Sequence, residues 1–341
     1  MKILVGISGG VDSAAAAKML MDAGHTVAGA TLVMHEYTEL DSARRVAASL
    51  GIPLHEIDCR ADFDRHVRTN LVNEYVSGRT PNPCIVCNAL VKFRRLADLA
   101  AELGFDAIAT GHYARIRSLS GRPTVAVAAD PKKDQSYMLY RLPHDVLSKL
   151  ILPLAELSKP EIRAYAASVG IPVADKADSL EICFIPDGNH AAYIESVAGK
   201  SVEGDFVDEN GKVIGRHLGI TRYTVGQRKG LGVALGLRAF ITDINPENNR
   251  ITLSTSPKKS SVIRISDTVF SGVASLDDIA DDDLFVKVRY AAPPVCARAV
   301  RLDDGRIELR LATPVTAAPG QSAVAYDASG SLLFGGFIDR V

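Results

Sequence analysis

The sequence predicts an α/β domain built on a parallel, doubly wound sheet, followed by two small, mostly β domains. In the first half, short apolar runs alternate with helical segments that end at a glycine, which is the pattern of a parallel sheet. After about residue 200 the helical pattern stops, and Asn210-Gly211 and Asp304-Gly305 predict hairpin turns between alternating segments. With 341 residues, the chain is also too long for one ordinary core.

The elements of the first half follow one another in chain order. The apolar runs expected as strands are residues 2–7, 26–33, 54–57 and 107–110. Three helices, each stopped by a glycine, are expected at residues 13–23, 40–50 and 88–103. A further helix is expected from Ser158 to Gly170, because Ser158 and Glu161 form a capping box and Pro160 fits the first turn.

The strands expected in the second half are short and closely spaced. They are residues 251–254, 285–289, 297–302, 307–311 and 322–326. We place the domains at residues 1–200, 201–258 and 259–341, with the second boundary near the sequence Ser256-Pro-Lys-Lys259.

Composition narrows the class of protein. The formal net charge is −1, so any surface that binds nucleic acid must be a local basic patch. The chain has no apolar run of about 18 residues and no signal-peptide pattern, so we expect a cytoplasmic protein without a membrane partner. Five cysteines, an odd number, argue against a disulfide framework and leave reactive or metal-binding thiols as the alternatives.

A glycine-serine loop follows the first expected strand and comprises Gly6, Ile7, Ser8, Gly9, Gly10, Val11, Asp12 and Ser13. Backbone N–H groups at the start of the next helix can hold an anion there, and the paired glycines allow phosphates to approach closely. The two serines can donate hydrogen bonds, whereas Asp12 is expected to hold Mg²⁺ or to fix the loop. The loop lacks the Gly-Lys-Ser/Thr ending of a Walker loop. It resembles the SGGxDS loop of the PP-loop ATP pyrophosphatases, which split ATP into AMP and pyrophosphate and leave AMP on a carbonyl oxygen.

Three cysteines form the second signal. Cys84 and Cys87 lie in the proline-rich sequence Arg79-Thr-Pro-Asn-Pro-Cys-Ile-Val-Cys-Asn88, just before an expected helix. A thiolate near a helix N-terminus is stabilised, so we expect a lowered thiol pKa. The C-x-x-C pair alone fits a redox pair, half a zinc site or part of an iron–sulfur site, but a Cys₄ zinc site needs a second pair. Cys183 lies in a segment, residues 178–184, that has the look of a movable loop.

The order of the motifs resembles the tRNA-specific 2-thiouridylases over nearly the whole chain. The ordered set is SGGVDS, TPNPCxxCN, ATGHYA at 109–114, KDQSYML at 133–139, ICF at 182–184, YTVGQRKGLG at 223–232, VRY at 288–290 and PGQS at 319–322. Two departures stand out: many members carry Asp where this chain has Cys84, and the segment around residues 37–41 is shorter than usual.

The resemblance carries implications for fold and activity. It implies a first domain of the PP-loop ATP pyrophosphatase type, a β-barrel as the last domain, and synthesis of 2-thiouridine at wobble position 34 of tRNA. ATP and Mg²⁺ are the implied cofactors. The implied partners are tRNA, with the Lys, Glu and Gln isoacceptors, and a sulfur donor such as a cysteine desulfurase or a sulfur-relay protein.

Residue roles carried over from the resemblance fall into three groups. The catalytic group is Cys87 as nucleophile, Cys183 as the carrier of a persulfide, and Asp12. The ATP-binding group is Gly6, Ile7, Ser8, Gly9, Gly10, Val11, Asp12, Ser13, Leu32 and Gly111. The tRNA-binding group is Asn82, Pro83, Cys84, His112, Lys133, Asp134, Gln135, Arg289, Tyr290 and Gln321.

The chemistry leaves two mechanisms open. In the first, adenylation turns uridine O2 into a good leaving group, and a persulfide sulfur on Cys183 attacks C2, or Cys87 releases that sulfur as a disulfide forms between the two cysteines. In the second, Cys84, Cys87 and Cys183 hold three irons of a [4Fe–4S] cluster, whose fourth iron carries the sulfur. Cys59 and Cys296 are interpreted as small apolar residues without a catalytic role.

Two acid-free basic segments predict the nucleic-acid surface. Residues 211–242 hold Lys212, Arg216, Arg222, Arg228, Lys229 and Arg238. Residues 286–301 hold Lys287, Arg289, Arg298 and Arg301. Such segments in a nearly neutral protein favour phosphate binding. Two rival interpretations are an amide-forming ligase with the same loop, which needs no trio of cysteines, and a nucleotide-binding regulatory module without catalysis.

Overall fold

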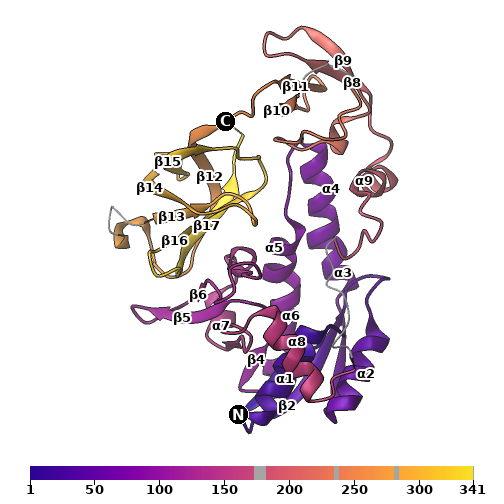
Figure 1. Ribbon diagram of the computed structural model, residues 1–341, viewed down its shortest axis with the longest axis vertical. Coiled ribbons are helices and arrows are strands. Elements are labelled where there is room, and N and C mark those ends of the chain that lie inside the picture. Colours follow the sequence, from indigo (N-terminus) through magenta and orange to yellow (C-terminus); the bar gives the residue numbers. More distant parts are fainter. Residues whose placement is uncertain (173–181, 234–237, 280–283, 341) are drawn as a thin grey trace.

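The computed structural model of the chain describes residues 1–172, 182–233, 238–279 and 284–340. An α/β domain forms the base of the elongated molecule, a small sheet lies at the opposite end, and a barrel lies on one side (Figure 1). Among these residues, no helix has both the length and the apolar character that are needed to cross a membrane.

The α/β domain is built on a sheet whose strand order is β3-β2-β1-β4-β7. All four pairings are parallel, which confirms the prediction of a parallel sheet. The strands are β1 (Lys2–Gly6), β2 (Thr26–Val33), β3 (Leu54–Asp58), β4 (Ala107–Ala109) and β7 (Leu150–Ile151). The edge strand β7 was not predicted, because two residues are too few to show a pattern.

Helices cover both faces of this sheet. On one face, Ile3 and Val5 of β1 share a buried cluster with α1 (Val11–Asp22), α2 (Leu40–Leu50) and α8 (Lys159–Ser168). On the other face, Leu4 packs with α6 (Phe93–Glu102) and α7 (His144–Leu147). The alternation along β1 follows from the two-residue period of a strand. The capping box of Ser158 and Glu161 at the start of α8 is confirmed.

Two long helices of the domain contain π-helical turns. One runs through α3 (Arg60–Phe63), the π turn η1 (Asp64–Arg68) and α4 (Thr69–Val76). The other runs through α5 (Pro83–Cys87), the π turn η2 (Asn88–Lys92) and α6. The prediction that this helix starts at Asn88 is therefore wrong. It starts at Pro83, because the Asn82 side chain accepts a hydrogen bond from the Cys84 N–H at 3.1 Å and caps it there.

Short elements connect the α/β domain to the second half of the chain. They are the hairpin of β5 (Arg115–Leu119) and β6 (Arg122–Ala126), the 3₁₀ turn η3 (Ser136–Leu139) and α9 (His190–Ala198). The sheet at the far end has the order β10-β11-β8-β9. Its strands are β8 (Gly204–Val207), β9 (Val213–His217), β10 (Phe240–Asn245) and β11 (Arg250–Ser254). Gly211, with φ of +81°, lies in the turn between β8 and β9, as the Asn210-Gly211 pair predicts.

The C-terminal domain is a closed barrel with the order β12-β15-β14-β13-β16-β17, which confirms the barrel implied by the family resemblance. Its strands are β12 (Ser260–Phe270), β13 (Leu284–Lys287), β14 (Val295–Arg301), β15 (Ile307–Val315), β16 (Ser322–Tyr326) and β17 (Leu332–Ile338). Val324, Tyr326 and Leu332 of the barrel belong to the buried core of the α/β domain. The Tyr137 hydroxyl also donates a hydrogen bond to the Ser322 carbonyl at 2.8 Å, so the two domains share one core.

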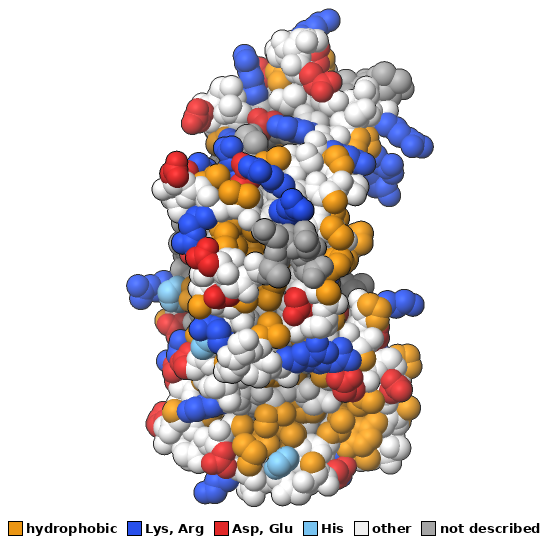
Figure 2. All heavy atoms as spheres, turned by 90° about the vertical axis from the view of Figure 1, so that its left-hand side faces the viewer, with side chains coloured by type: hydrophobic (Ala, Val, Ile, Leu, Met, Phe, Trp, Pro, Cys, Tyr) orange, Lys and Arg blue, Asp and Glu red, His pale blue; other side chains and the backbone are white. Residues whose placement is uncertain are grey.

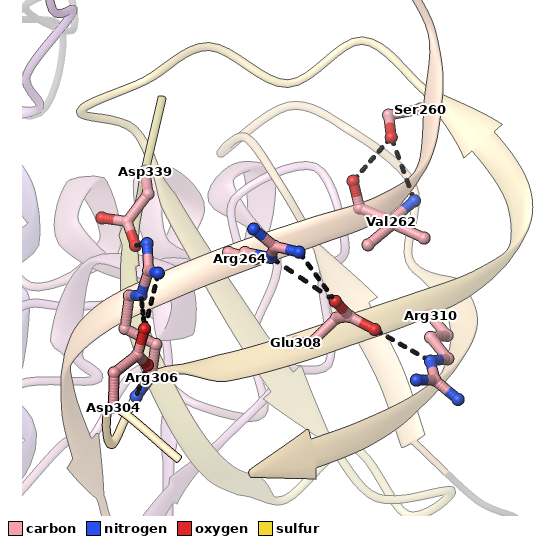
Figure 3. Close-up of polar contacts among 8 residues, drawn as sticks. All are labelled: Ser260, Val262, Arg264, Asp304, Arg306, Glu308, Arg310 and Asp339. Carbon is pink, nitrogen blue, oxygen red and sulfur yellow. Dashed lines mark hydrogen bonds and ion pairs between the residues drawn. The ribbon is translucent and has the colours of Figure 1, made fainter. Parts of the chain in front are cut away.

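The outer wall of the barrel carries a charged network (Figure 3). Glu308 on β15 accepts hydrogen bonds from Arg264 on β12 at 3.4 and 3.5 Å and from Arg310 at 3.0 Å. Arg306 donates to Asp304 next to the Asp304-Gly305 turn. Acidic partners thus offset part of the positive charge of this wall.

Candidate active site

The loop from Gly6 to Ser13 joins β1 to α1 at the carboxyl edge of the sheet. The Ser13 hydroxyl donates to the Gly10 carbonyl at 3.0 Å and accepts from the Ser8 N–H at 3.2 Å. Because α1 starts at Val11 without a side-chain cap, its first N–H groups can bind an anion.

The two glycines of this loop differ in what they allow. Gly9 has φ of +78°, and a Cβ there would lie 2.6 Å from the Cβ of Ser42 in α2. At Gly10, the atom nearest to an added Cβ would be the Ser8 Oγ, at 3.6 Å. Gly9 therefore shapes the loop against α2, whereas Gly10 leaves open space where a phosphate can approach.

Asp12 ties three segments of the domain together. Lys159, the first residue of α8, donates to both carboxylate oxygens of Asp12 at 2.7 Å, and the Tyr113 hydroxyl donates to one of them at 2.7 Å. The Lys159 side chain is 10% exposed and the Asp12 side chain 31%, so the ammonium end of this ion pair is the better shielded from water. This geometry supports the expected role of fixing the loop, and Asp12 is also the carboxylate of this loop that could hold Mg²⁺.

The turn after β4 lies directly against the same loop. A Cβ on Gly111 would lie 2.6 Å from the carbonyl carbon of Asp12, so only glycine fits there. His112 follows, with its Nδ1 2.7 Å from the Thr110 hydroxyl and its ring against Phe93. Burial, together with the nearby Lys92 cation, holds the pKa of His112 well below its usual range, so the ring is neutral at pH 7.

Cys87 is the last residue of α5 and is buried. Its thiol donates to the Met34 sulfur at 3.7 Å, which places it just beyond the carboxyl end of β2. The pKa of the Cys87 thiol is raised to about 12, mainly by burial; Lys92 opposes the rise, and the nearby Cys183 and Cys84 add to it. The expected low pKa is thus wrong: the helix begins four residues before Cys87, so its free N–H groups are not at this thiol, and desolvation dominates.

Cys183 is exposed at the surface of a tight turn. The Ile185 N–H donates to the Ile182 carbonyl at 2.8 Å and closes this turn, while Phe184 and Ile185 are buried. Surrounding protein atoms desolvate the Cys183 thiol, and Cys84 adds a repulsion, so that both raise the thiol pKa. Residues 178–181, where we expected the start of a movable loop, lie outside the described residues.

Cys84, Cys87 and Cys183 lie close enough for their charges to interact, but they are not arranged as a set of metal ligands. In the described part of the chain, no group of three or more His, Cys, Asp or Glu side chains is arranged to hold a metal ion. The ligand set of the [4Fe–4S] alternative is therefore not formed among these residues. Cys59 is buried in the same apolar cluster as Cys87, and Cys296 is exposed on β14.

Barrel residues reach the cysteine site. Tyr290 lies close enough to Cys84 and Asp134 for the charges of both groups to raise its pKa, although burial is the larger cause. Lys287 lies 3.9 Å from the Asp134 carboxylate and faces the Tyr290 ring at 5.8 Å. Asp134 itself is buried and accepts hydrogen bonds from the Ala128 and Ser136 N–H groups.

Three other residues expected at tRNA form hydrogen bonds with neighbouring segments. Gln321 donates to the Thr80 carbonyl at 2.7 Å and joins the barrel to the proline-rich loop. Arg289 donates to the Val225 carbonyl at 3.3 Å and joins the barrel to the segment before β10. The Gln135 side chain accepts from the Tyr113 N–H at 2.9 Å.

Several residues at the site escaped the sequence reasoning. Lys159 stands at the first position of a helix that was predicted, but nothing in the sequence pairs it with Asp12. Tyr113 was visible only as part of the ATGHYA motif. Lys92, the last residue of η2, acts to lower the thiol pKa of all three cysteines, and a π turn leaves no pattern in the sequence.

Comparisons with known proteins agree over the full chain. Residues 1–187 match the family described as "tRNA methyl transferase HUP domain", residues 191–255 the "tRNA methyl transferase PRC-barrel domain", and residues 263–338 the "Aminomethyltransferase beta-barrel domain". A protein of Lachnoclostridium phytofermentans named "tRNA-specific 2-thiouridylase MnmA" is 40% identical over 98% of both chains. The "tRNA-specific 2-thiouridylase MnmA 1" of Clostridium tetani is 40% identical over 100% of this chain and 97% of its own.

Solved structures give a weaker likeness. A 4-thiouridine synthetase in complex with RNA and ATP superposes with a TM-score of 0.39 at 19% identity, over 57% of this chain and 50% of that chain. This superposition is too weak to support any inference about function. The full-length identity to the curated relatives is decisive, and the chain belongs to the tRNA-specific 2-thiouridylase family.

Proposed function

We propose that the protein is a cytoplasmic tRNA-uridine 2-sulfurtransferase. ATP adenylates the C2 carbonyl oxygen of uridine 34, pyrophosphate leaves, and sulfur then replaces the oxygen as AMP departs. The observation that carries the proposal is the position of Cys87. Its thiol contacts Met34 at the same carboxyl edge of the sheet where the loop from Gly6 to Ser13 begins α1.

The loop supplies the adenylation half of the reaction. The N–H groups at the start of α1 bind the phosphates of ATP, and Leu32 and Gly111 line the adenosine side. Mg²⁺ is bound in proteins by one or two carboxylates together with substrate phosphates, and Asp12 is the carboxylate that this loop offers. When bound, the ion would neutralise phosphate charge; Lys159 holds the Asp12 side chain in place for it.

The cysteines supply the sulfur half. A persulfide on Cys183 attacks C2 through its terminal sulfur, and the C–O bond to AMP breaks. The Cys87 thiol loses its proton to water, and the resulting thiolate attacks the Cys183 Sγ. The sulfur–sulfur bond of the persulfide then breaks, and its electron pair stays on the sulfur bound to C2 as a Cys87–Cys183 disulfide forms. If this second attack comes first, it releases hydrosulfide, which attacks C2. A thiol reductant restores both cysteines in either order.

The second half of the chain supplies the tRNA surface. Figure 2 shows Lys and Arg side chains gathered in the upper half of one face, at the level of the barrel and the small sheet in Figure 1. Lys133, Arg289 and Tyr290 contact the tRNA near the cysteines, and Asn82, Pro83 and Cys84 frame the base. The buried Asp134 shapes the Lys133 turn, and does so from inside the protein.

Rival chemistries fit the site less well. An amide-forming ligase would use the same loop but has no need for three thiols beside it. Methyl transfer, which appears in the descriptions of the matching families, has no need for an adenylating loop.

The test is reconstitution with tRNA, labelled ATP, cysteine and a cysteine desulfurase. AMP, pyrophosphate and 2-thiouridine are expected to form in equal amounts and only when tRNA is present. Formation of ADP and phosphate would contradict the proposal. Iron and sulfide are measured in the same anaerobic preparation, and full activity without iron is expected.

A further inference from the structure

Phe184 directly follows Cys183, and its ring is enclosed on four sides. Phe63 at the end of α3 meets it edge-on at 5.1 Å, and Tyr193 of α9 meets it edge-on at 5.4 Å. The Arg68 guanidinium lies 5.7 Å from the ring centre, and the His35 ring lies at 6.4 Å. Four side chains from three segments of the chain therefore surround one ring, which is 3% exposed.

Arg68 is itself held in place. It donates to Glu36 at 2.6 Å and to Asp64 at 3.0 Å, and it also lies 5.8 Å from the centre of the Phe63 ring. The guanidinium, at the end of the π turn η1, therefore lies beside both phenylalanine rings and within cation–π distance of each. Burial of an apolar ring requires only apolar neighbours, whereas Phe184 also contacts a guanidinium that two carboxylates hold in place.

The turn from Ile182 to Ile185 carries both the buried Phe184 ring and the exposed Cys183 thiol. Phe184 and Ile185 point into the apolar cluster that also contains Cys87, whereas Cys183 stays exposed. The closing hydrogen bond from Ile185 to Ile182 makes the turn short, so the position of the Phe184 ring dictates the position of the Cys183 sulfur.

We propose that Phe184, clamped by Arg68, is a positioning residue that sets the effective concentration of the Cys183 sulfur at Cys87. The consequence for catalysis rests on the proposed sulfur transfer, in which these two sulfurs must join. Phe184 touches neither ATP nor the base in this role; it acts through Cys183.

The effective concentration is measured directly with a glutathione buffer. Cys87 and Cys183 thiols react with glutathione disulfide to give the Cys87–Cys183 disulfide and two molecules of glutathione, and the equilibrium constant has units of concentration. The full-length chain is used with Cys59, Cys84 and Cys296 replaced by serine, so that only the wanted disulfide forms. Phe184→Leu is expected to lower the constant roughly tenfold, since small misplacements of reacting groups have effects of this size or larger.

Matched variants separate positioning from general damage. Phe334→Leu removes an equally buried ring from the barrel and should leave the constant unchanged. Arg68→Met should lower the constant in the same direction as Phe184→Leu, whereas Arg68→Lys, which keeps the charge, should restore part of it. In the unmodified cysteine background, Phe184→Leu should slow 2-thiouridine formation but not the tRNA-dependent release of pyrophosphate in the first turnover.

The possible results separate a failure of the positioning role from a failure of the proposed function. If Phe184→Leu folds and its equilibrium constant equals that of the parent, the positioning role is overturned. If Phe184→Leu does not fold, Arg68→Met decides the question in the same way. If Phe184→Leu and Arg68→Met lower the equilibrium constant but the parent protein never makes 2-thiouridine, the proposed function fails and the positioning role stands.

Discussion

Cys87 is a neutral thiol in the free protein. With its pKa raised to about 12, almost none of the Cys87 thiol is ionised at pH 7. Such a thiol resists oxidation and stray alkylation until substrate arrives. Its reactivity must therefore come from its surroundings, and Lys92 is the cation that acts on it, on Cys84 and on Cys183.

Replacing Lys92 tests this electrostatic role. Lys92→Met removes a positive charge, so the pKa of Cys87 should rise and its thiolate fraction at any given pH should fall. We expect alkylation of Cys87 by iodoacetamide, followed by peptide mass spectrometry between pH 8 and 10, to slow by about threefold or more. Lys149→Met, at an exposed site, is the control. Equal rates in Lys92→Met and the parent would show that Lys92 does not stabilise the thiolate.

Substitution by serine should divide four of the five cysteines sharply by function. Cys87→Ser and Cys183→Ser should each abolish 2-thiouridine, because a hydroxyl neither carries sulfur nor forms a disulfide. Cys59→Ser and Cys296→Ser should keep nearly full activity, with a loss of stability of about 1 kcal/mol at the buried Cys59. Nucleoside mass spectrometry of the tRNA measures the outcome. Activity in Cys183→Ser would remove that residue from the mechanism.

Among the elements, α1, α8 and the turn after β4 meet at Asp12. Asp12→Asn leaves the Lys159 ammonium facing a neutral group in a largely shielded place, so we expect a loss of about 1–2 kcal/mol in the free energy of unfolding. AMP formation should fall as well. Lys159→Met should reduce AMP formation in the same direction. Lys18→Met, which breaks an exposed ion pair with Asp22 on the same helix, is the control for stability and activity. Normal AMP formation in Lys159→Met would confine Lys159 to a structural role.

At the same scale, the sequence was informative wherever a period or a cap could be seen. The four predicted strands of the parallel sheet, the Ser158 capping box and the Gly211 turn were correct, because each depends on neighbours in the chain. The π turns η1 and η2, and with them the placement of Arg68 and Lys92, could not be predicted, because only tertiary packing selects them. The pKa of Cys87 was predicted in the wrong direction for the same reason, because the C-x-x-C motif does not show how deeply the thiol is buried. The domain boundaries and the individual tRNA contacts stay predictions.

At the scale of the whole molecule, tRNA affinity should depend on the basic half of the chain. For about five phosphate contacts, log K should fall with log salt concentration at a slope of roughly −4 to −5. In the full-length chain, Lys212→Gln, Arg228→Gln and Lys229→Gln should each lower the affinity and flatten the slope by roughly 1 where a contact is lost. Filter binding at several salt concentrations measures both, with Lys149→Gln as the control. Unchanged slopes in all three variants would place the tRNA elsewhere.

Because the first and last domains share a core, the first domain cannot complete its packing until the ribosome has translated the last domain. One apolar face of the first domain is covered by Val324, Tyr326 and Leu332, which are translated near the end of the chain. At 5–20 residues per second, the delay after residue 152 is roughly 10 to 30 s. During that time the nascent chain exposes apolar surface, and it is then a natural client for a chaperone. Ribosome-bound chains stalled at residue 250 should be captured by a trigger-factor-type chaperone more strongly than released full-length chains, and equal capture would show that the first domain closes its core alone.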